Sequence, residues 1–239
     1  AIWRSCLPMV SAADLTGKRS GSLDWSTGVG TVTMIDANTG RAAYSLTPFG
    51  ASFLGGVRLT SGIGRINGVL TSLFAVASGP GMAPTVKIYS AVNGAFIRQF
   101  TPFASSYRGG VELAMSNPDR NGKTILVVTA LSTAEVKVYD ISNTASPLKS
   151  FKAFTQPMST LSLRVGDLNG DGLNEIVTGV GKGLAPTVRV FSDAGVKLKE
   201  FLAFERGYTG GVNLGISDFD HDGALDIVAG TANSAKGKV

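Results

Sequence analysis

Two short acidic loops carry the side chains in this sequence that are best suited to chemistry. The first runs from Asp167 to Glu175, and the second runs from Asp218 to Asp226, 51 residues further on. In each loop, side chains with oxygen atoms stand at positions 1, 3, 5 and 9, and glycine stands at position 6. Position 7 adds a backbone carbonyl. A hard cation with six or more oxygen ligands requires such a set, and the glycine permits the sharp turn that gathers the oxygens.

Calcium suits these loops better than magnesium. Calcium tolerates long and irregular bonds to oxygen, whereas magnesium demands a near-ideal octahedron and keeps several waters. Carboxylates packed into nine residues would also repel one another without a counter-charge. We therefore predict two calcium sites. The expected ligands are Asp167, Asn169, Asp171, Leu173 (carbonyl) and Glu175 in one loop, and Asp218, Asp220, Asp222, Ala224 (carbonyl) and Asp226 in the other.

The acidic loops differ from EF-hands. Position 12 is Thr178 or Ala229 instead of a bidentate glutamate, and the flanking residues favour strands. A polar turn without metal is the alternative interpretation, because Asp, Asn and Gly favour turns by themselves. The recurrence of the same pattern in two successive repeats favours the metal sites.

Earlier copies of the loop have lost ligands. The third copy, Asn117–Gly122, keeps the shape of the turn, but Ile125 stands where the last carboxylate is needed. The second copy has Arg65 at a ligand position, and Lys18 interrupts the first. We therefore expect two metal sites instead of five.

The loops belong to a repeat of about 50 residues. Each copy holds about four short segments that alternate with period two between Gly, Asn, Asp and Pro clusters, which indicates strands. A Gly-Gly-Val motif precedes the first of these segments in three copies. Apolar pairs three positions apart close the copies at steps of 54, 51 and 50 residues: Leu46/Phe49, Phe100/Phe103, Phe151/Phe154 and Phe201/Phe204.

Four strands per copy at this period are typical of a β-propeller blade. The sequence therefore predicts an all-β fold, a β-propeller of about 50-residue four-stranded blades, with four blades plus an incomplete fifth. We expect a single repeat domain over residues 1–239. Because the fifth copy holds only two full strands, we expect a portion of a longer propeller that associates when expressed alone. The blades are expected at approximately 8–46, 47–100, 101–151, 152–201 and 202–239.

Composition agrees with this fold and argues against several functional classes. The chain has 31 Gly and 9 Pro among 239 residues, which argues against a helical protein, and 44% hydrophobic residues, enough for a core. The net charge is +5, but the basic residues are scattered, so we expect no nucleic-acid partner. No apolar run approaches the roughly 18 residues of a membrane span. One cysteine and one histidine argue against disulfide frameworks, zinc sites and catalytic triads, so we expect no enzyme.

The order of these motifs resembles the FG-GAP/VCBS-type propeller repeat of integrin alpha chains and many secreted bacterial proteins. The resemblance rests on Gly-Gly-Val, the acidic loops, the stretch Ala185–Val188 and the closing phenylalanine. It covers residues 8–239 and is strongest over 152–239. It implies calcium in the loops between strands, a secreted or cell-surface location, and an extracellular protein or glycan as the partner. Kelch repeats share the glycine pair but lack the acidic loop.

We therefore expect a noncatalytic calcium-binding extracellular β-propeller that acts as an adhesion or interaction module. Two alternatives stay open: a carbohydrate-binding, lectin-like propeller, and a propeller module of a larger secreted enzyme. Phe53, Tyr107 and Tyr208 recur at equivalent places before the blades. These rings could stack on sugars, although packing within the connections between blades is the favoured interpretation.

Overall fold

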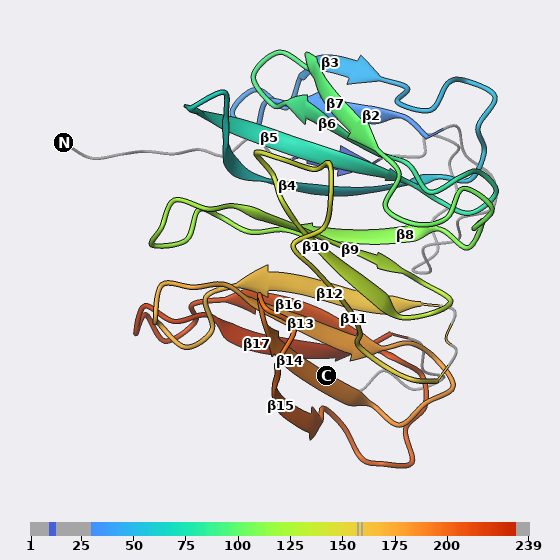
Figure 1. The fold of residues 1–239 in the computed structure, drawn as a ribbon, viewed down its shortest axis with the longest axis vertical. Coiled ribbons are helices and arrows are strands. Elements are labelled where there is room, and N and C mark those ends of the chain that lie inside the picture. The colour runs from blue at the N-terminus through green and yellow to red at the C-terminus, as the bar shows by residue number, and fades with distance from the viewer. Residues whose placement is uncertain (1–9, 13–29, 157, 159, 233–239) are drawn as a thin grey trace. The chain divides into compact units, whose positions relative to one another are not determined.

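The chain is built from β-strands joined by turns. The structure, a computed structural model, describes residues 10–12, 30–156, 158 and 160–232, which contain 17 strands in five antiparallel sheets (Figure 1). Within the described residues, no helix is long and apolar enough to cross a membrane. The sheets are β1 (Val10–Ala12), β2 (Val32–Ile35) and β3 (Ala42–Leu46); β4 (Val57–Ile66), β5 (Val69–Ser78), β6 (Val86–Ser90) and β7 (Phe96–Phe100); β8 (Val111–Met115), β9 (Ile125–Ala130), β10 (Glu135–Asp140) and β11 (Lys149–Lys152); β12 (Leu161–Gly166), β13 (Glu175–Val180), β14 (Thr187–Ser192) and β15 (Lys197–Leu202); and β16 (Val212–Ser217) with β17 (Asp226–Thr231).

The sheets follow the predicted blades. The three four-stranded sheets end at Phe100, Lys152 and Leu202, within one residue of the blade ends expected from the repeat. This confirms the all-β class and the four-stranded unit. In the first sheet, three strands are described, and β1 pairs directly with β2. Residues 13–29, which separate β1 from β2 in the chain, lie outside the described residues. Two strands of the fifth blade are described, and residues 233–239 also lie outside.

Contacts divide the chain into two compact units, Ala1–Ile63 with Val69–Gly110 and Gly64–Gly68 with Val111–Val239. In the first unit, Met34 of β2 packs with Phe74 of β5 and Tyr89 of β6. The rings of Phe74 and Tyr89 are stacked, with centroids 5.1 Å apart. The organisation of residues 1–239 as a single repeat domain stays a prediction.

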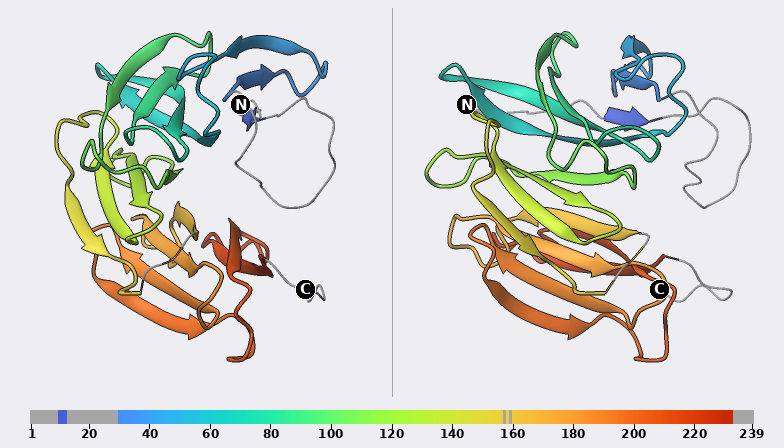
Figure 2. Two further views of the ribbon diagram at one scale, coloured as in Figure 1. Left: turned by 90° about the vertical axis from the view of Figure 1, so that its right-hand side faces the viewer. Right: turned by 45° about the vertical axis from the view of Figure 1, so that its right-hand side comes forward.

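The core of the second unit lies between successive sheets (Figure 2). Strands β9 and β13 are buried along their whole length, and their apolar residues join one cluster with those of β12 and β16. Neighbouring sheets touch through their first strands, β8 against β12 and β12 against β16. A strand that is covered on both faces needs apolar residues at consecutive positions. Strand β13 accordingly has the consecutive buried residues Ile176 and Val177 instead of an alternating pattern.

The turn between the first and second strands differs among the sheets. In the β4–β5 hairpin it consists of two residues, Asn67 and Gly68, whose φ angles are 51° and 80°. This left-handed pair forms the tight turn that matches the twist of two antiparallel strands. Eight residues connect β12 to β13 and β16 to β17, and these connections are the acidic loops.

The Gly-rich stretch after the second strand packs directly on backbone. A Cβ atom at Gly181 would overlap the carbonyl oxygen of Thr160, and one at Gly79 would overlap that of Gly55. Glycine is therefore required at both places by the close approach of two chain segments. In the sheet β4–β7, the glycine before the first strand and the glycine after the second strand are thus two sides of one contact, whereas Thr160 takes the first place in the sheet β12–β15.

Gly181→Ala should lower the free energy of unfolding by about 1–3 kcal/mol, the usual cost of forcing an extra group into a packed site. The matched control is Gly207→Ala, because a Cβ at Gly207 would meet no atom within 4 Å and the backbone there is not left-handed. Urea titration of both variants checks the prediction. Equal stability of the two variants would contradict the packing argument.

Candidate metal centre

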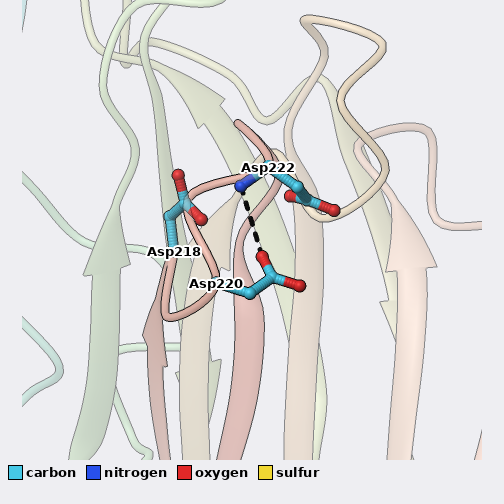
Figure 3. A group of neighbouring side chains, drawn as sticks. All are labelled: Asp218, Asp220 and Asp222. Atoms are coloured by element: carbon cyan, nitrogen blue, oxygen red, sulfur yellow. Dashed lines mark hydrogen bonds between the residues drawn. The ribbon is translucent and has the colours of Figure 1, made fainter.

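The loop between β16 and β17 brings three carboxylates together. Oxygen atoms of Asp218, Asp220 and Asp222 lie within 4.8 Å of one another (Figure 3). Backbone donors hold these side chains: the N–H of Asp222 donates to Asp220 Oδ1 (3.2 Å) and the N–H of Gly223 to Asp218 Oδ2 (3.2 Å). The N–H of Ala224 donates to Asp222 Oδ1 (2.8 Å). The loop therefore gathers like charges on one side of a tight turn.

One oxygen of this cluster lacks a donor. Asp218 Oδ1 is buried and accepts no hydrogen bond from the described residues. A buried carboxylate oxygen without a partner is costly, because it has lost water and gained nothing in exchange. A hard cation would supply the missing interaction, so the residues present fit a calcium ion. Asp226, at position 9, accepts the N–H of Phe219 through Oδ2 (3.1 Å).

The loop between β12 and β13 repeats this network position by position. In both loops, four backbone N–H groups donate to side-chain oxygens of the same loop. The N–H of position 6 donates to the side chain of position 1, and the N–H of position 5 donates to that of position 3. The N–H of position 7 donates to the side chain of position 5, and the N–H of position 2 donates to that of position 9. The bonds here run from Gly172 N–H to Asp167 Oδ2 (2.8 Å), Asp171 N–H to Asn169 Oδ1 (2.9 Å), Leu173 N–H to Asp171 Oδ1 (2.7 Å) and Leu168 N–H to Glu175 Oε2 (2.9 Å).

The two loops differ at position 3. Asn169 donates its amide to Asp171 Oδ2 (3.2 Å) and to Glu175 Oε1 (3.5 Å). The amide hydrogens partly offset the repulsion between these two carboxylates, which Asp220 cannot do at the same place in the other loop. The loop from Asp167 therefore holds three carboxylates with internal compensation, and the loop from Asp218 holds four without it.

Glu175 is the most deeply buried of the acidic ligands, with 4% of its surface exposed. Burial raises the pKa of its carboxyl group, the N–H of Leu168 opposes this, and the nearby charges of Asp171, Asp167 and Asp193 raise the pKa further. The ionised form of Glu175 is therefore costly in the folded protein without a cation.

Left-handed backbone occurs at two positions of each loop. The glycines at position 6, Gly172 and Gly223, have φ angles of 81° and 92°, as the sequence predicted from the need for a sharp turn. Position 4 is also left-handed, with φ of 72° at Gly170 and 62° at His221. The sequence analysis assigned no role to position 4. His221 is exposed and turns the chain there without being a predicted ligand.

The third loop, Asn117–Ile125, keeps the turn but has different side chains at the positions proposed for ligands. Asp119 Oδ1 accepts the N–H groups of Asn121 (2.8 Å) and Lys123 (2.9 Å). Lys123, at position 7, pairs through Nζ with Asp193 Oδ2 at 2.6 Å. Position 9 is Ile125, which is buried at the start of β9. A lysine ammonium thus supplies positive charge beside this loop.

Hydrogen bonds connect consecutive loops, and the sequence analysis missed these contacts. Arg120 donates its N–H to Gly172 O and its Nη1 to Asp171 O, both at 2.8 Å. The N–H of Leu225 donates to Asp167 O at 2.9 Å. The partners lie about 50 residues apart in the chain, so no local pattern marks them. The spacing of the repeat was the one available signal, because it places equivalent turns side by side.

The aromatic residues of the connections are engaged within the fold. Tyr107 donates its hydroxyl to Gly110 O (3.0 Å), and Tyr208 donates to Gly211 O (3.1 Å). Each of these rings, and Phe53 at the equivalent place, contacts a phenylalanine four residues earlier, with centroids 5.3 to 6.0 Å apart. The rings therefore pack the connections, as the favoured interpretation of the sequence had it.

Comparison with known proteins bears on the fold. No family model and no curated protein matches the chain. Among solved structures, the WD40 repeats of RRP9 match with a TM-score of 0.50 and 19% identity, over 77% of this chain and 47% of that one. The Dos1 propeller matches with a TM-score of 0.50 and 10% identity, over 84% and 49%. The chain spans about half the length of these structures. The likeness confirms a β-propeller.

In the calcium-free protein, Glu175→Gln should raise the melting temperature near neutral pH, because it removes a costly buried charge. The pKa of Glu175 in the folded protein lies above its ordinary value of 4.5. The stability that protonated Glu175 contributes is therefore fully present below pH 4.5 and is lost as the pH rises through the folded-state pKa. The advantage of the variant should therefore be small at about pH 4 and grow toward about pH 7.

Thermal unfolding in the presence of a chelator measures this difference. Each kcal/mol corresponds to about 2–4 °C for a chain of this size. The control is Glu205→Gln at an exposed position. A variant that is less stable than the parent at every pH would show that the charge on Glu175 is already compensated by the protein itself.

Proposed function

We propose that this chain is a calcium-binding β-propeller module of the FG-GAP/VCBS type that mediates adhesion or another interaction outside the cell and performs no catalysis. The observation that carries the proposal is the hydrogen-bond network that the two acidic loops share, together with the three clustered carboxylates and the orphaned oxygen of Asp218. The same backbone network holds oxygen side chains at positions 1, 3, 5 and 9 in both loops, which is the set that a calcium ion requires.

Each loop offers up to five protein ligands, four side chains and one carbonyl. Calcium takes six to eight oxygens, so water would complete the shell. Most of the ligand side chains in these loops are partly or fully exposed, Glu175 being the buried exception. Short loops of this kind suit the weak affinities of extracellular modules, with Kd of about 10⁻⁴ to 10⁻³ M. Sites of such affinity would be loaded at a secreted or cell-surface location, which is part of the proposal.

The role of the ion in this proposal is structural. The loops join the first two strands of the sheets β8–β11, β12–β15 and β16–β17, at the same end of each sheet. Backbone hydrogen bonds join each loop to the next. An ion that fixes one turn therefore also fixes the place where two sheets meet. Fixing these strand ends would keep the remaining surface loops in position for a partner.

A protein is the partner that we favour. The aromatic rings that might have stacked on a glycan are packed against phenylalanines, and two of their hydroxyl groups are used by backbone carbonyls. The absence of catalysis is part of the proposal, supported by a sequence with a single histidine, which lies exposed in an acidic loop.

Calcium should raise the melting temperature, because it binds the folded chain and has no preformed site in the unfolded chain. At a calcium concentration of about 100 Kd, one site contributes about 2.7 kcal/mol, which corresponds to roughly 5–10 °C. Elemental analysis should find two ions per chain. Asp222→Ala should bind one ion and lose about half of the thermal shift.

The matched control is Asp119→Ala in the third loop. Asp119 makes the same kind of backbone contacts as the loop aspartates, but its loop ends on Ile125. This variant should be less stable than the parent while keeping the full shift produced by calcium. No bound calcium at millimolar supply, or an equal loss of the shift in both variants, would refute the metal sites.

A further inference from the structure

A single peptide unit joins the two acidic loops. The peptide between Ala224 and Leu225 carries, on one side, the carbonyl oxygen at position 7, which is a proposed calcium ligand. On its other side, the N–H of Leu225 donates to the carbonyl oxygen of Asp167 at 2.9 Å. Asp167 is position 1 of the neighbouring loop. The same planar group therefore faces one proposed ion and holds the first ligand residue of the other site.

A second contact reinforces this connection. The side chain of Leu225 packs over Gly166, the residue that precedes Asp167, so closely that a Cβ on Gly166 would overlap Leu225 Cδ1. The same Cβ would lie 3.1 Å from Ile216 Cδ1. Both the residue before Asp167 and the carbonyl of Asp167 are thus positioned by the far end of the loop that begins at Asp218.

We propose that the two calcium sites are positively coupled through this peptide, so that an ion in either loop raises the affinity of the other loop. The inference rests on the proposed calcium binding. A cation on the carbonyl of Ala224 polarises the peptide and makes the N–H of Leu225 a better donor to Asp167. In the other direction, an ion bound by the side chain of Asp167 fixes the carbonyl of Asp167. That carbonyl accepts the N–H of Leu225, so positions 7 to 9 of the second loop are fixed as well.

The strength of one backbone hydrogen bond sets the size of the effect. A net contribution of the usual magnitude corresponds to about a 2- to 10-fold change in affinity. Electrostatics acts in the opposite direction, because a loaded loop is less negative and attracts the second ion less. Salt screens that opposing effect, with a Debye length of about 8 Å at physiological ionic strength. The coupling should therefore grow as the salt concentration rises.

Isothermal titration with calcium tests the proposal on the whole chain. Asp171→Ala disables the first loop and Asp222→Ala disables the second, and each variant reports the affinity of the remaining site alone. We expect the first binding step of the intact chain to match the single-site affinities and the second step to be about 2- to 10-fold tighter than they predict. Glu175→Gln serves in place of Asp171→Ala if that variant does not fold.

The outcomes separate the two proposals. If the second ion binds the intact chain no more tightly than the single-site affinities predict, the coupling is refuted while the calcium sites stand. If the intact chain binds no calcium, both the coupling and the proposed function are refuted. Positive coupling that weakens as salt is added would contradict this expected salt dependence and would also overturn the inference.

A single-atom replacement tests the peptide itself. Incorporation of the α-hydroxy analogue of leucine at position 225 replaces the N–H by an ester oxygen and leaves the side chain unchanged. Comparison of the chain with and without Asp171→Ala in this background should give a coupling factor close to one. Leu225→Ala is the matched control, since it trims the side chain and keeps the N–H, and it should keep most of the coupling. A full coupling factor in the ester would refute the proposed route.

Discussion

The mutual covering of sheets is the constraint on which the rest of the second unit depends. Strands β9 and β13 are buried on both faces, so neither sheet is stable in water without a neighbour on each side. Sheets that must stack in the same orientation place equivalent turns next to one another. The acidic loops meet for this reason. Packing thus creates the crowding of carboxylates that an ion would relieve.

The three loops differ in how many carboxylates they hold and in which groups lie beside those carboxylates. The third loop has a lysine at position 7 that reaches Asp193, and the fourth uses the amide of Asn169 between two carboxylates. The fifth has four carboxylates and a buried oxygen without a donor. Among these three loops, the charge left uncompensated by the described residues is therefore greatest in the fifth, where an ion would act most strongly.

Much of this arrangement could be predicted from local sequence. The apolar pairs that begin at Phe100 and Phe201 mark the ends of their sheets to within one residue. The positions of the loop oxygens also follow from the spacing, because a nine-residue turn has few ways to place its side chains. The loop residues that were proposed as ligands accordingly occupy matching places in both turns.

Contacts between blades could not be predicted in the same way. Arg120 lies in a loop without its final acid, and its spacing gives no sign that it reaches two carbonyls of the next loop. The glycines at positions 79 and 181 are required by a close approach of two backbone segments, which exists only in three dimensions. The left-handed turn at His221 was likewise hidden, because only a few per cent of non-glycine residues adopt a positive φ.

The Asn67-Gly68 turn has a consequence for the order in which the chain matures during synthesis. The β4–β5 hairpin closes with backbone torsions alone, so it can form as soon as its two strands have left the ribosome. The later hairpins β12–β13 and β16–β17 end in acidic turns instead. Under the proposed function, the β4–β5 hairpin would therefore form without an ion, whereas the two later turns would gain their counter-charge only where calcium is supplied.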